Sequence, residues 1–384
     1  MNLKLFRHKI SAFAIAIVAI AAMTSCGGDS KDEPEASAPR SVLVYMLADN
    51  SLGGRNYDYA DLNEMVEGAR EGALGQSRLL VYHAPRGENP SLKEVTANGI
   101  NVIKTYDRET SSASSGRMSQ AIADFKSHAP ADNYGLILWS HGSGWLQNGM
   151  EPPTASAKSF GDDRGYAMNV TTLATVLDGE NFDYVYFDCC YMGGVEVAYE
   201  LRGVTDHIIA SAIELPANGM PYDQNLRYLT ARQPKLREAA ATTFAYYDSQ
   251  SGEDRTCAIS LIDTSALDDL ASATREVYES SNGLIDGFRP QPFMVGSCYL
   301  FDFAHYAESM KADQSKLDRF DTALKRAVVY HASTPSIWEM VDIKHHCGLS
   351  TFILDEADDA TYRNYNQLSW YGDVASHIKF LNSH

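Results

Sequence analysis

Short apolar runs alternate with amphipathic segments along the chain from residue 41 onward, and no other feature of the sequence constrains the fold as strongly. Such runs are typical of strands that are buried on both faces of a sheet. The segments between them carry apolar residues at helical spacing. Buried strands that alternate with helices predict βαβ units and a mostly parallel sheet with helices on both faces. The runs are four to seven residues long and lie at 41–47, 79–82, 135–139, 184–187 and 207–210.

The N-terminal segment is predicted to direct export rather than to join the fold. Basic residues precede an apolar run at 10–22, which is too short to span a bilayer as a helix and suits the core of a signal peptide. The run ends in Met23-Thr24-Ser25-Cys26, which resembles the lipobox of bacterial lipoproteins. We therefore expect residues 1–25 to be removed and Cys26 to carry a lipid. An ordinary secretory signal followed by a chance cysteine is the alternative.

Residues 26–40 are predicted to form a flexible acidic tether, because they hold almost no apolar side chain that a core could bury. Acidic residues directly after a lipidated cysteine resemble the surface-export signal of some Gram-negative lipoproteins. We therefore expect an exported protein, anchored through Cys26 in the cell envelope of a Gram-negative bacterium. The outer membrane is the expected partner.

The charge of the chain excludes nucleic acid as a partner. The sequence has 32 basic and 50 acidic residues, a formal charge of −18, and no long cluster of Lys or Arg. Binding to phosphates requires a basic face, which this composition does not supply. Without residues 1–25 the charge becomes −21, because that segment contains three basic residues and no acidic one.

Two strand ends carry the residue types of nucleophilic catalysis. The run at 135–139 is followed closely by His141, and the run at 184–187 is followed by Cys189 and Cys190. Parallel α/β sheets bind ligands beyond the carboxyl ends of their strands, so the imidazole and a thiol are expected at one edge. Taken separately, a structural histidine and a buried packing cysteine are the alternatives.

The chemistry of these residue types is coherent. An imidazole can take the proton of a thiol and later donate it to a leaving amine. The positive end of the helix that follows Cys190 is expected to lower the pKa of its thiol. Gly142 has no side chain, so its backbone N–H can face a developing oxyanion, and the Cys190 N–H is the expected second donor.

Other hydrolytic chemistries lack their motifs. Ser143 lies in His-Gly-Ser-Gly, which lacks the first glycine of the nucleophile elbow of serine hydrolases. The zincin motif H-E-x-x-H is absent from the sequence. His345, His346 and Cys347 are interpreted as structural, because adjacent residues rarely converge on one metal ion. No metal site is therefore expected.

Longer motifs around the two strand ends resemble the clostripain-like cysteine peptidases of the caspase-like clan. The first motif is Leu138-Trp139-Ser140-His141-Gly142-Ser143-Gly144-Trp145. The second is Phe187-Asp188-Cys189-Cys190-Tyr191-Met192-Gly193-Gly194-Val195-Glu196-Val197-Ala198-Tyr199-Glu200-Leu201. Shorter matches at 48–52, 61–65, 161–163 and 219–222 extend the resemblance over roughly residues 41–225.

The resemblance implies a caspase-like three-layer α/β/α sandwich around a mostly parallel sheet. It assigns residues 41–235 to the catalytic core, and we expect residues 236–384 to extend the same sandwich as C-terminal additions. The family pattern is Asp, a small residue, Cys, any residue, Met-Gly. It implies that Cys190 is the nucleophile and that Cys189 takes the small-residue place and packs inward. The general base of the family falls on His141.

The resemblance also implies two substrate-binding positions. Asp188 matches an acidic residue that helps to line the pocket for a basic side chain before the scissile bond, and it could also cap the following helix. Members that cleave after Arg or Lys carry a second Asp where this chain has Asn218. An amide cannot neutralise a guanidinium, so the change would weaken binding of a basic residue by about 1–3 kcal/mol. Cleavage after Arg or Lys and a different or relaxed preference are both compatible with these residues.

Together these observations predict an exported, lipid-anchored cysteine endopeptidase that cleaves peptide or protein substrates through a Cys190–His141 dyad and an acyl-enzyme. A non-catalytic surface module that uses the same fold to bind another protein or a glycan is the alternative. Family members often cut themselves between the two motifs. Residues 146–168 contain Lys158 and Arg164, so self-cleavage in this segment is a further hypothesis.

No cofactor is expected. Calcium dependence occurs in the family, but the chain has no EF-hand pattern and no other compact carboxylate cage. A monomer is expected, and the aromatic residues of the C-terminal part, Trp338 and Trp370 among them, are assigned to the core.

Overall fold

The structure, a computed structural model, describes residues 37–146, 159–296, 299–353 and 359–378. The chain divides into two units, Met1–Ala36 and Ser37–His384, and all described residues belong to the second. The predicted signal peptide, the lipidation site Cys26 and the self-cleavage candidate Lys158 lie outside the described residues. Within the described part of the chain, no helix is long and apolar enough to cross a membrane.

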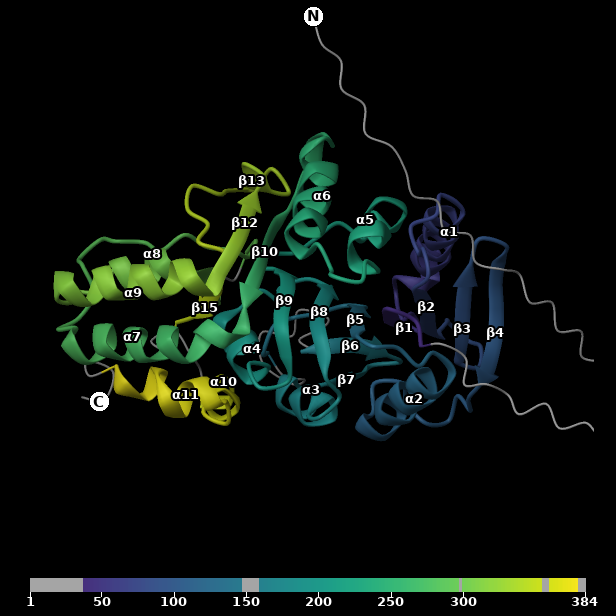
Figure 1. The fold of residues 1–384 in the computed structure, drawn as a ribbon. Coiled ribbons are helices and arrows are strands. Elements are labelled where there is room, and N and C mark those ends of the chain that lie inside the picture. Colours follow the sequence, from purple (N-terminus) through teal and green to yellow (C-terminus); the bar gives the residue numbers. More distant parts are fainter. Residues whose placement is uncertain (1–36, 147–158, 297–298, 354–358, 379–384) are drawn as a thin grey trace, which may run out of the picture. The chain divides into compact units, whose positions relative to one another are not determined.

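A nine-stranded sheet forms the centre of the second unit (Figure 1), in the order β12-β10-β9-β8-β5-β1-β2-β3-β4. Its five central strands pair in parallel, as the continuous apolar runs predict for strands covered on both faces. They are β1 (Ser41–Leu47), β2 (Arg78–Ala84), β5 (Tyr134–Trp139), β8 (Phe182–Asp188) and β9 (Thr205–Ser211). Antiparallel strands complete both edges: β3 (Ser91–Thr96) and β4 (Gly99–Thr105) on one side, β10 (Ala258–Asp263) and β12 (Val328–Ser333) on the other.

Helices cover both faces of this sheet. Successive side chains of a strand point to opposite faces, and those of β1 divide accordingly: Val42, Val44 and Met46 join one buried cluster, while Leu43 and Tyr45 join the other. The first cluster is closed by α1 (Tyr57–Arg70), α5 (Tyr222–Leu229) and α6 (Leu236–Asp248). The second is closed by α2 (Ser115–His128), α3 (Val170–Leu177), α4 (Val195–Glu200), α7 (Leu267–Ser280), α8 (Phe303–Glu308) and α9 (Gln314–Ala327). The predicted three-layer α/β/α sandwich is confirmed.

The C-terminal part of the chain adds strands and helices to the same sandwich. The amphipathic pattern of residues 315–330 by itself predicts one helix. In the structure that helix, α9, ends at Ala327, because Val328 and Val329 begin β12 as β-branched residues on the sheet edge. The helix prediction is therefore wrong for its last three residues.

The remaining strands and α-helices of the described residues are β6 (Phe160–Asp163), β7 (Tyr166–Met168), β11 (Leu300–Asp302), β13 (Ser336–Ile337), β14 (Val341–Asp342), β15 (Ser350–Phe352), α10 (Asp359–Tyr365) and α11 (Ser369–Asp373).

The last residues of the predicted tether belong to the fold. Ala38 forms a bridge with Ala131. The Arg40 side chain is only 1% exposed, and its Nη2 lies 2.5 Å from the Asp183 carboxylate, while its Nε donates to the Ala231 carbonyl at 2.9 Å. The tether prediction for residues 26–40 is therefore wrong at its C-terminal end, because a long-range ion pair holds a residue that looks solvent-exposed in sequence.

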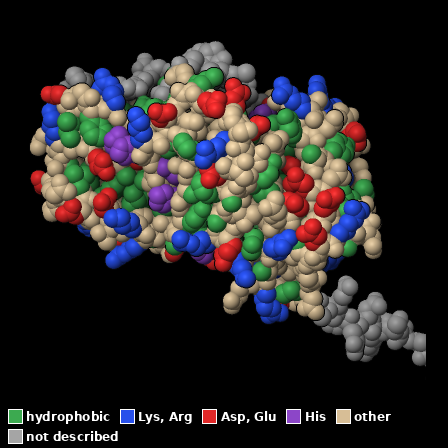
Figure 2. All heavy atoms as spheres, turned by 90° about the horizontal axis from the view of Figure 1, so that it is seen from above, with side chains coloured by type: hydrophobic (Ala, Val, Ile, Leu, Met, Phe, Trp, Pro, Cys, Tyr) green, Lys and Arg blue, Asp and Glu red, His purple; other side chains and the backbone are tan. Residues whose placement is uncertain are grey.

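The surface carries mixed charge. On the face shown in Figure 2, Lys and Arg side chains are scattered among Asp and Glu side chains and do not gather into one stripe. The acidic sequence thus folds with interspersed charges on this face, whereas phosphate binding would require a basic one.

Candidate active site

The two strand ends singled out in the sequence meet at one pocket of about 190 Å³. The pairing of β5 with β8 places Trp139 opposite Asp188, so the residues that follow the two strands emerge side by side. His141 and Cys190 both line the pocket. Its full lining is Leu52, Trp139, Ser140, His141, Asp188, Cys189, Cys190, Glu214, Leu215, Pro216, Ala217, Gly219 and Trp338.

The two neighbouring cysteines have different environments. Cys189 is 3% exposed, and its thiol donates a hydrogen bond to the Leu138 carbonyl at 3.0 Å. Cys190 is half-buried, and its sulfur accepts a hydrogen bond from the Leu215 N–H at 3.4 Å. Cys189 therefore packs inward, and Cys190 is the thiol that a ligand in the pocket can reach.

The surroundings of the Cys190 thiol favour its protonated form. Burial raises its pKa to about 12, the Leu215 N–H acts in the opposite direction, and the Glu214 carboxylate raises it further. The sequence places Cys190 near a helix N-terminus, but in the structure the N-cap of that helix is Gly194, four residues further on. Helix α4 begins only at Val195, and the loss of water around the sulfur dominates.

A rigid loop holds His141 from the other side. The Ser51 Oγ lies 2.8 Å from the His141 Nε2. The neighbouring Asn50 fixes this loop, because its side-chain amide donates to the carbonyls of Leu47 and Asp162, each at 2.8 Å. These contacts come from the end of β1, so three parallel strands contribute to the positions of His141 and Cys190.

Gly142 brings the histidine loop close to the cysteine loop. A Cβ at this position would lie 2.6 Å from the Cys190 carbonyl oxygen and 2.9 Å from the Cys189 Cβ. No side chain fits in that space without moving one of the loops. The predicted oxyanion donors, the N–H groups of Gly142 and Cys190, thus belong to two segments in direct contact.

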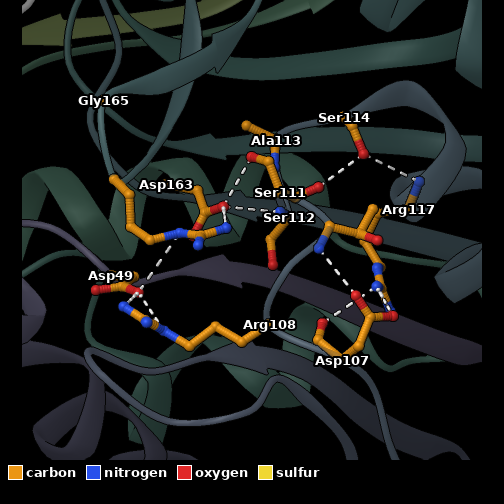
Figure 3. A network of polar contacts seen from close by, with 12 residues as sticks. Asp49, Asp107, Arg108, Ser111, Ser112, Ala113, Ser114, Arg117, Asp163 and Gly165 are labelled. Atoms are coloured by element: carbon orange, nitrogen blue, oxygen red, sulfur yellow. Dashed lines mark hydrogen bonds and ion pairs between the residues drawn. The ribbon is translucent and has the colours of Figure 1, made fainter.

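Figure 3 shows a polar network that supports the loop after β1. The Asp49 carboxylate accepts from Arg108 Nη2 at 2.6 Å and lies 3.9 Å from Arg164 Nε. Asp163 accepts from Ser111 Oγ at 2.7 Å and pairs with Arg164 Nη2 at 3.4 Å. The network ties the β6–β7 hairpin and the segment before α2 to the loop that carries Ser51.

Asp188 is an acidic residue on the wall of the pocket. It is 6% exposed and accepts hydrogen bonds from the Met220 N–H and the Tyr222 hydroxyl, each at 3.0 Å. It does not cap the following helix, whose N-cap is Gly194, so that alternative is wrong. Its side chain is directed by contacts with the segment that leads into α5.

Asn218 lies at the rim rather than in the wall. Its side chain is exposed and hydrogen-bonds Tyr246, while its neighbours Ala217 and Gly219 line the pocket. Of the two predicted substrate-binding positions, Asp188 is therefore among the residues that line the pocket, and Asn218 is not.

Two residues of the pocket wall were missed in the sequence. Glu214 accepts a hydrogen bond from the Trp338 Nε1 at 3.2 Å, and both side chains line the pocket. Trp338 packs against the apolar cluster that contains Ile213 and also lines the pocket, so its assignment to the core holds in part, whereas Trp370 is fully buried as expected. Trp338 has a left-handed backbone, with φ of 51°, at the tip of the β13–β14 hairpin. No local pattern signals this placement, since the hairpin is remote in sequence from both strand ends.

The C-terminal part also braces the cysteine loop from behind. The Ser350 N–H donates to the Gly193 carbonyl at 2.9 Å, directly before α4. Glu196 on α4 accepts from the Phe352 N–H and the Thr351 hydroxyl, each at 2.9 Å. Strand β15 therefore supports the turn that presents Cys190.

No group of three or more His, Cys, Asp or Glu side chains that could hold a metal ion occurs within residues 37–146, 159–296, 299–353 and 359–378. His346 is half-buried beside Phe293 and His331, and the loss of water around its ring lowers its pKa to about 3. It is therefore a neutral ring in this structure.

The fold and the pocket define a caspase-like α/β protein with a thiol and an imidazole at the carboxyl edge of its sheet. Residues 44–286 match the model of the clostripain family, and the chain belongs to this family. Clostripain from Hathewaya histolytica is 25% identical over 228 residues, which are 51% of this chain and 43% of clostripain. The chain thus matches less than half the length of that relative.

Solved structures agree over a larger share of the chain. An inactive zymogen C11 protease from Parabacteroides distasonis has a TM-score of 0.77 and 30% identity, and the match covers 88% of this chain and 99% of that one. A secreted C11 cysteine protease from Bacteroides thetaiotaomicron, in complex with an irreversible peptide inhibitor, has a TM-score of 0.74, 30% identity and the same coverage. The predicted family and fold are confirmed.

Proposed function

We propose that this protein is a cysteine endopeptidase that hydrolyses peptide bonds through Cys190 and His141. The observation that carries the proposal is the convergence of the reachable thiol and the imidazole on one pocket, in a chain of the clostripain family. The inhibitor-bound relative supports it, because a C11 protease of this fold takes a peptide ligand.

The reaction follows from the chemistry of the two side chains. His141 takes the proton of the Cys190 thiol, and the sulfur attacks the carbonyl carbon of the scissile bond. The N–H groups of Gly142 and Cys190 are the proposed donors to the oxyanion. His141 then protonates the leaving amine, and water hydrolyses the thioester. Burial raises the pKa of the Cys190 thiol, so we propose that His141 takes its proton as the sulfur attacks, without a preformed thiolate.

The substrate class follows from the charge of the pocket wall. Asp188 and Glu214 line the pocket, and no Lys or Arg is among its lining residues in the described part of the chain. An acidic wall favours a cationic side chain, so we propose cleavage after Arg or Lys. Asn218 at the rim contributes no charge to this recognition.

A positional-scanning peptide library tests the activity and the preference together. Wild type should cleave after Arg or Lys, and Cys190→Ala should abolish cleavage. Cys189→Ala is the matched control, since the same change one residue away removes a thiol that faces the core. Equal loss in both variants would contradict the assignment of the nucleophile. Hydrolysis by none of the three proteins would favour a binding module.

Export and lipid anchoring are part of the same proposal. The secreted relative supports export, and the lipobox-like sequence that ends in Cys26 supports a lipid anchor in the envelope of a Gram-negative bacterium. Mass spectrometry of the N-terminal peptide from membranes should show a diacylglyceryl cysteine. Cys26→Ala should move the protein out of the membrane fraction.

Self-cleavage, if it occurs between the two motifs, is proposed at Lys158 rather than Arg164. The Arg164 backbone has φ of 56° in the β6–β7 turn, and its guanidinium is held by Asp49 and Asp163. A protease binds its substrate as an extended strand, which this turn does not offer. Intact masses of wild type, Lys158→Gln and Cys190→Ala should show cleavage only in wild type, and added calcium should not be required.

A further inference from the structure

A second carboxylate lies next to Asp188, behind the wall of the pocket. Asp61 on α1 is 2% exposed and does not line the pocket itself. A Cβ built on Gly219 would lie 2.9 Å from Asp188 Oδ2 and 3.2 Å from Asp61 Oδ2. These distances place the two oxygens at most about 6 Å apart. Both carboxylates therefore face the place that a side chain at position 219 would occupy.

Only neutral donors hold this pair. Trp139 Nε1 donates to Asp61 Oδ2 at 2.5 Å, and Trp139 is itself a lining residue. The Met220 N–H and the Tyr222 hydroxyl serve Asp188. In the described part of the chain, neither carboxylate forms an ion pair with Lys, Arg or His. Two negative charges at this distance, both shielded from water, are costly unless one is neutralised.

The groups that face the pair increase this cost. Helix α1 contributes two further carboxylates, and the ring of His141 and the carboxylate of Glu214 line the same pocket as Asp188. The titratable groups around the pair are Asp58 and Glu64 of α1, Tyr186 of β8, Cys189 and Cys190 after β8, Tyr222 of α5, and Tyr246 and Tyr247 of α6.

Burial raises the pKa of both carboxyl groups, and the neighbouring charge of Asp188 raises that of Asp61 further. Burial, followed by the Asp188 charge, raises the pKa of Asp61 to about 9, and burial raises that of Asp188 to about 6. The two values belong to the pair, which loses its protons in two steps. Near neutral pH the pair therefore binds one proton and carries one negative charge.

We propose that Asp61 sets the substrate specificity through Asp188: the pair keeps one proton while the pocket is empty and releases it to solvent when the side chain of Arg or Lys enters. This inference rests on the proposed peptidase function. The guanidinium or ammonium group keeps its own charge, so the proton lost from the pair is the only one that moves. The fully ionised pair then supplies two negative charges, although position 218 is an amide.

The affinity of the pocket for a cationic side chain should depend on pH. When one proton leaves for each cation bound, affinity for the cation rises by up to tenfold per pH unit over the range in which the free pair still holds that proton. For this pair the range lies above the ordinary pKa of an aspartate, because burial raises the pKa of both carboxyl groups. Binding of a neutral side chain of the same shape releases no proton from the pair, so the affinity for that side chain does not change with pH in this way.

Kinetics with two matched peptides test this consequence. The peptides differ only in Arg or citrulline before the scissile bond, and kcat/KM is measured from pH 6 to 9. The Arg-to-citrulline ratio cancels the titration of Cys190 and His141. In wild type the ratio should rise at least tenfold across this range. In Asp61→Asn, which keeps an oxygen for the Trp139 N–H, the ratio should be independent of pH.

Glu67→Gln is the matched control, because it removes one charge from the exposed face of the same helix and should behave as wild type. A merely structural role of Asp61 would lower both rates without changing the slope of their ratio. A flat ratio in wild type, an unchanged slope in Asp61→Asn, or a preference for citrulline would overturn the inference. The peptidase assignment would survive these outcomes as long as cleavage depends on Cys190.

Calorimetry distinguishes a failure of the proposed peptidase function from a failure of the proposed proton release. Cys190→Ala protein is titrated with the Arg peptide at pH 7.5 in two buffers of different ionisation enthalpy. About one proton should be released per peptide bound, and none in the Cys190→Ala, Asp61→Asn double variant. Proton release without hydrolysis by wild type would remove the proposed function and leave the inference standing. Binding without proton release would overturn the inference whether or not wild type is active.

Discussion

Replacement of Glu196 by glutamine should remove a pH-dependent loss of stability. The Glu196 side chain is fully buried on α4, a few residues after Cys190. Its Oε1 accepts from the Phe352 N–H, the Thr351 hydroxyl and, at 3.3 Å, the Tyr365 hydroxyl. Its Oε2 is buried without a hydrogen-bond partner in the described part of the chain. The carboxylate form therefore has one oxygen that nothing solvates.

Burial raises the pKa of Glu196 from its ordinary value of 4.5 to about 7, against the opposing effect of its hydrogen bonds. Below pH 4.5 the group is protonated in both the folded and the unfolded chain. Between the two pKa values the folded chain keeps a proton that the unfolded chain has lost, so the free energy of unfolding falls as pH rises. The total loss is about 3 kcal/mol, since each pKa unit corresponds to about 1.4 kcal/mol.

Urea unfolding from pH 5 to pH 8.5 measures this effect. The Cys190→Ala background removes any self-cleavage, and the free energy of unfolding is compared with and without Glu196→Gln. The difference between the two proteins should shift by about 2–3 kcal/mol in favour of glutamine as pH rises. Glu67→Gln, on an exposed position, should show a difference that is constant with pH. A constant difference for Glu196→Gln as well would refute the reasoning.

Three further predictions concern the pocket. Alkylation of Cys190 by iodoacetamide at pH 7 should be at least about 100-fold slower than that of a cysteine of ordinary pKa, because burial keeps the thiol protonated. Peptide mass spectrometry over time measures the rate of alkylation, and a fast reaction would contradict the raised pKa. Gly142→Ala should destabilise the protein by about 1–3 kcal/mol and abolish cleavage, because the new methyl group would lie 2.6 Å from the Cys190 carbonyl oxygen. An unchanged melting temperature and an unchanged kcat would be incompatible with this contact. Ser51→Ala should lower kcat by about two- to tenfold with KM unchanged, as expected for one exposed hydrogen bond to His141, and a change confined to KM would argue against it.

The parallel centre of the fold was predictable because it is buried on both faces. Strands such as β1 and β8 read as continuous apolar runs, and the carboxyl edge of a parallel sheet is where His141 and Cys190 had to meet. Edge strands give no such signal. The side chains of β4 are exposed or half-buried, and in the sequence β12 reads as a continuation of the preceding helix. Strands that are buried on one side lack a continuous apolar pattern.

The amino-acid sequence by itself determined the layered α/β fold, the family, and the two residues proposed to react, because these depend on local patterning and on motifs of adjacent residues. Only the tertiary structure decided the chemistry of the pocket. Asp61, Glu214 and Trp338 are far from the two motifs in sequence, and the chain brings them to Asp188 and Cys190 through α1, the segment after β9 and a C-terminal hairpin. Burial, like-charge repulsion and hydrogen bonding act through space, so the raised pKa values of the thiol and of the carboxyl pair arise only once these segments are packed together.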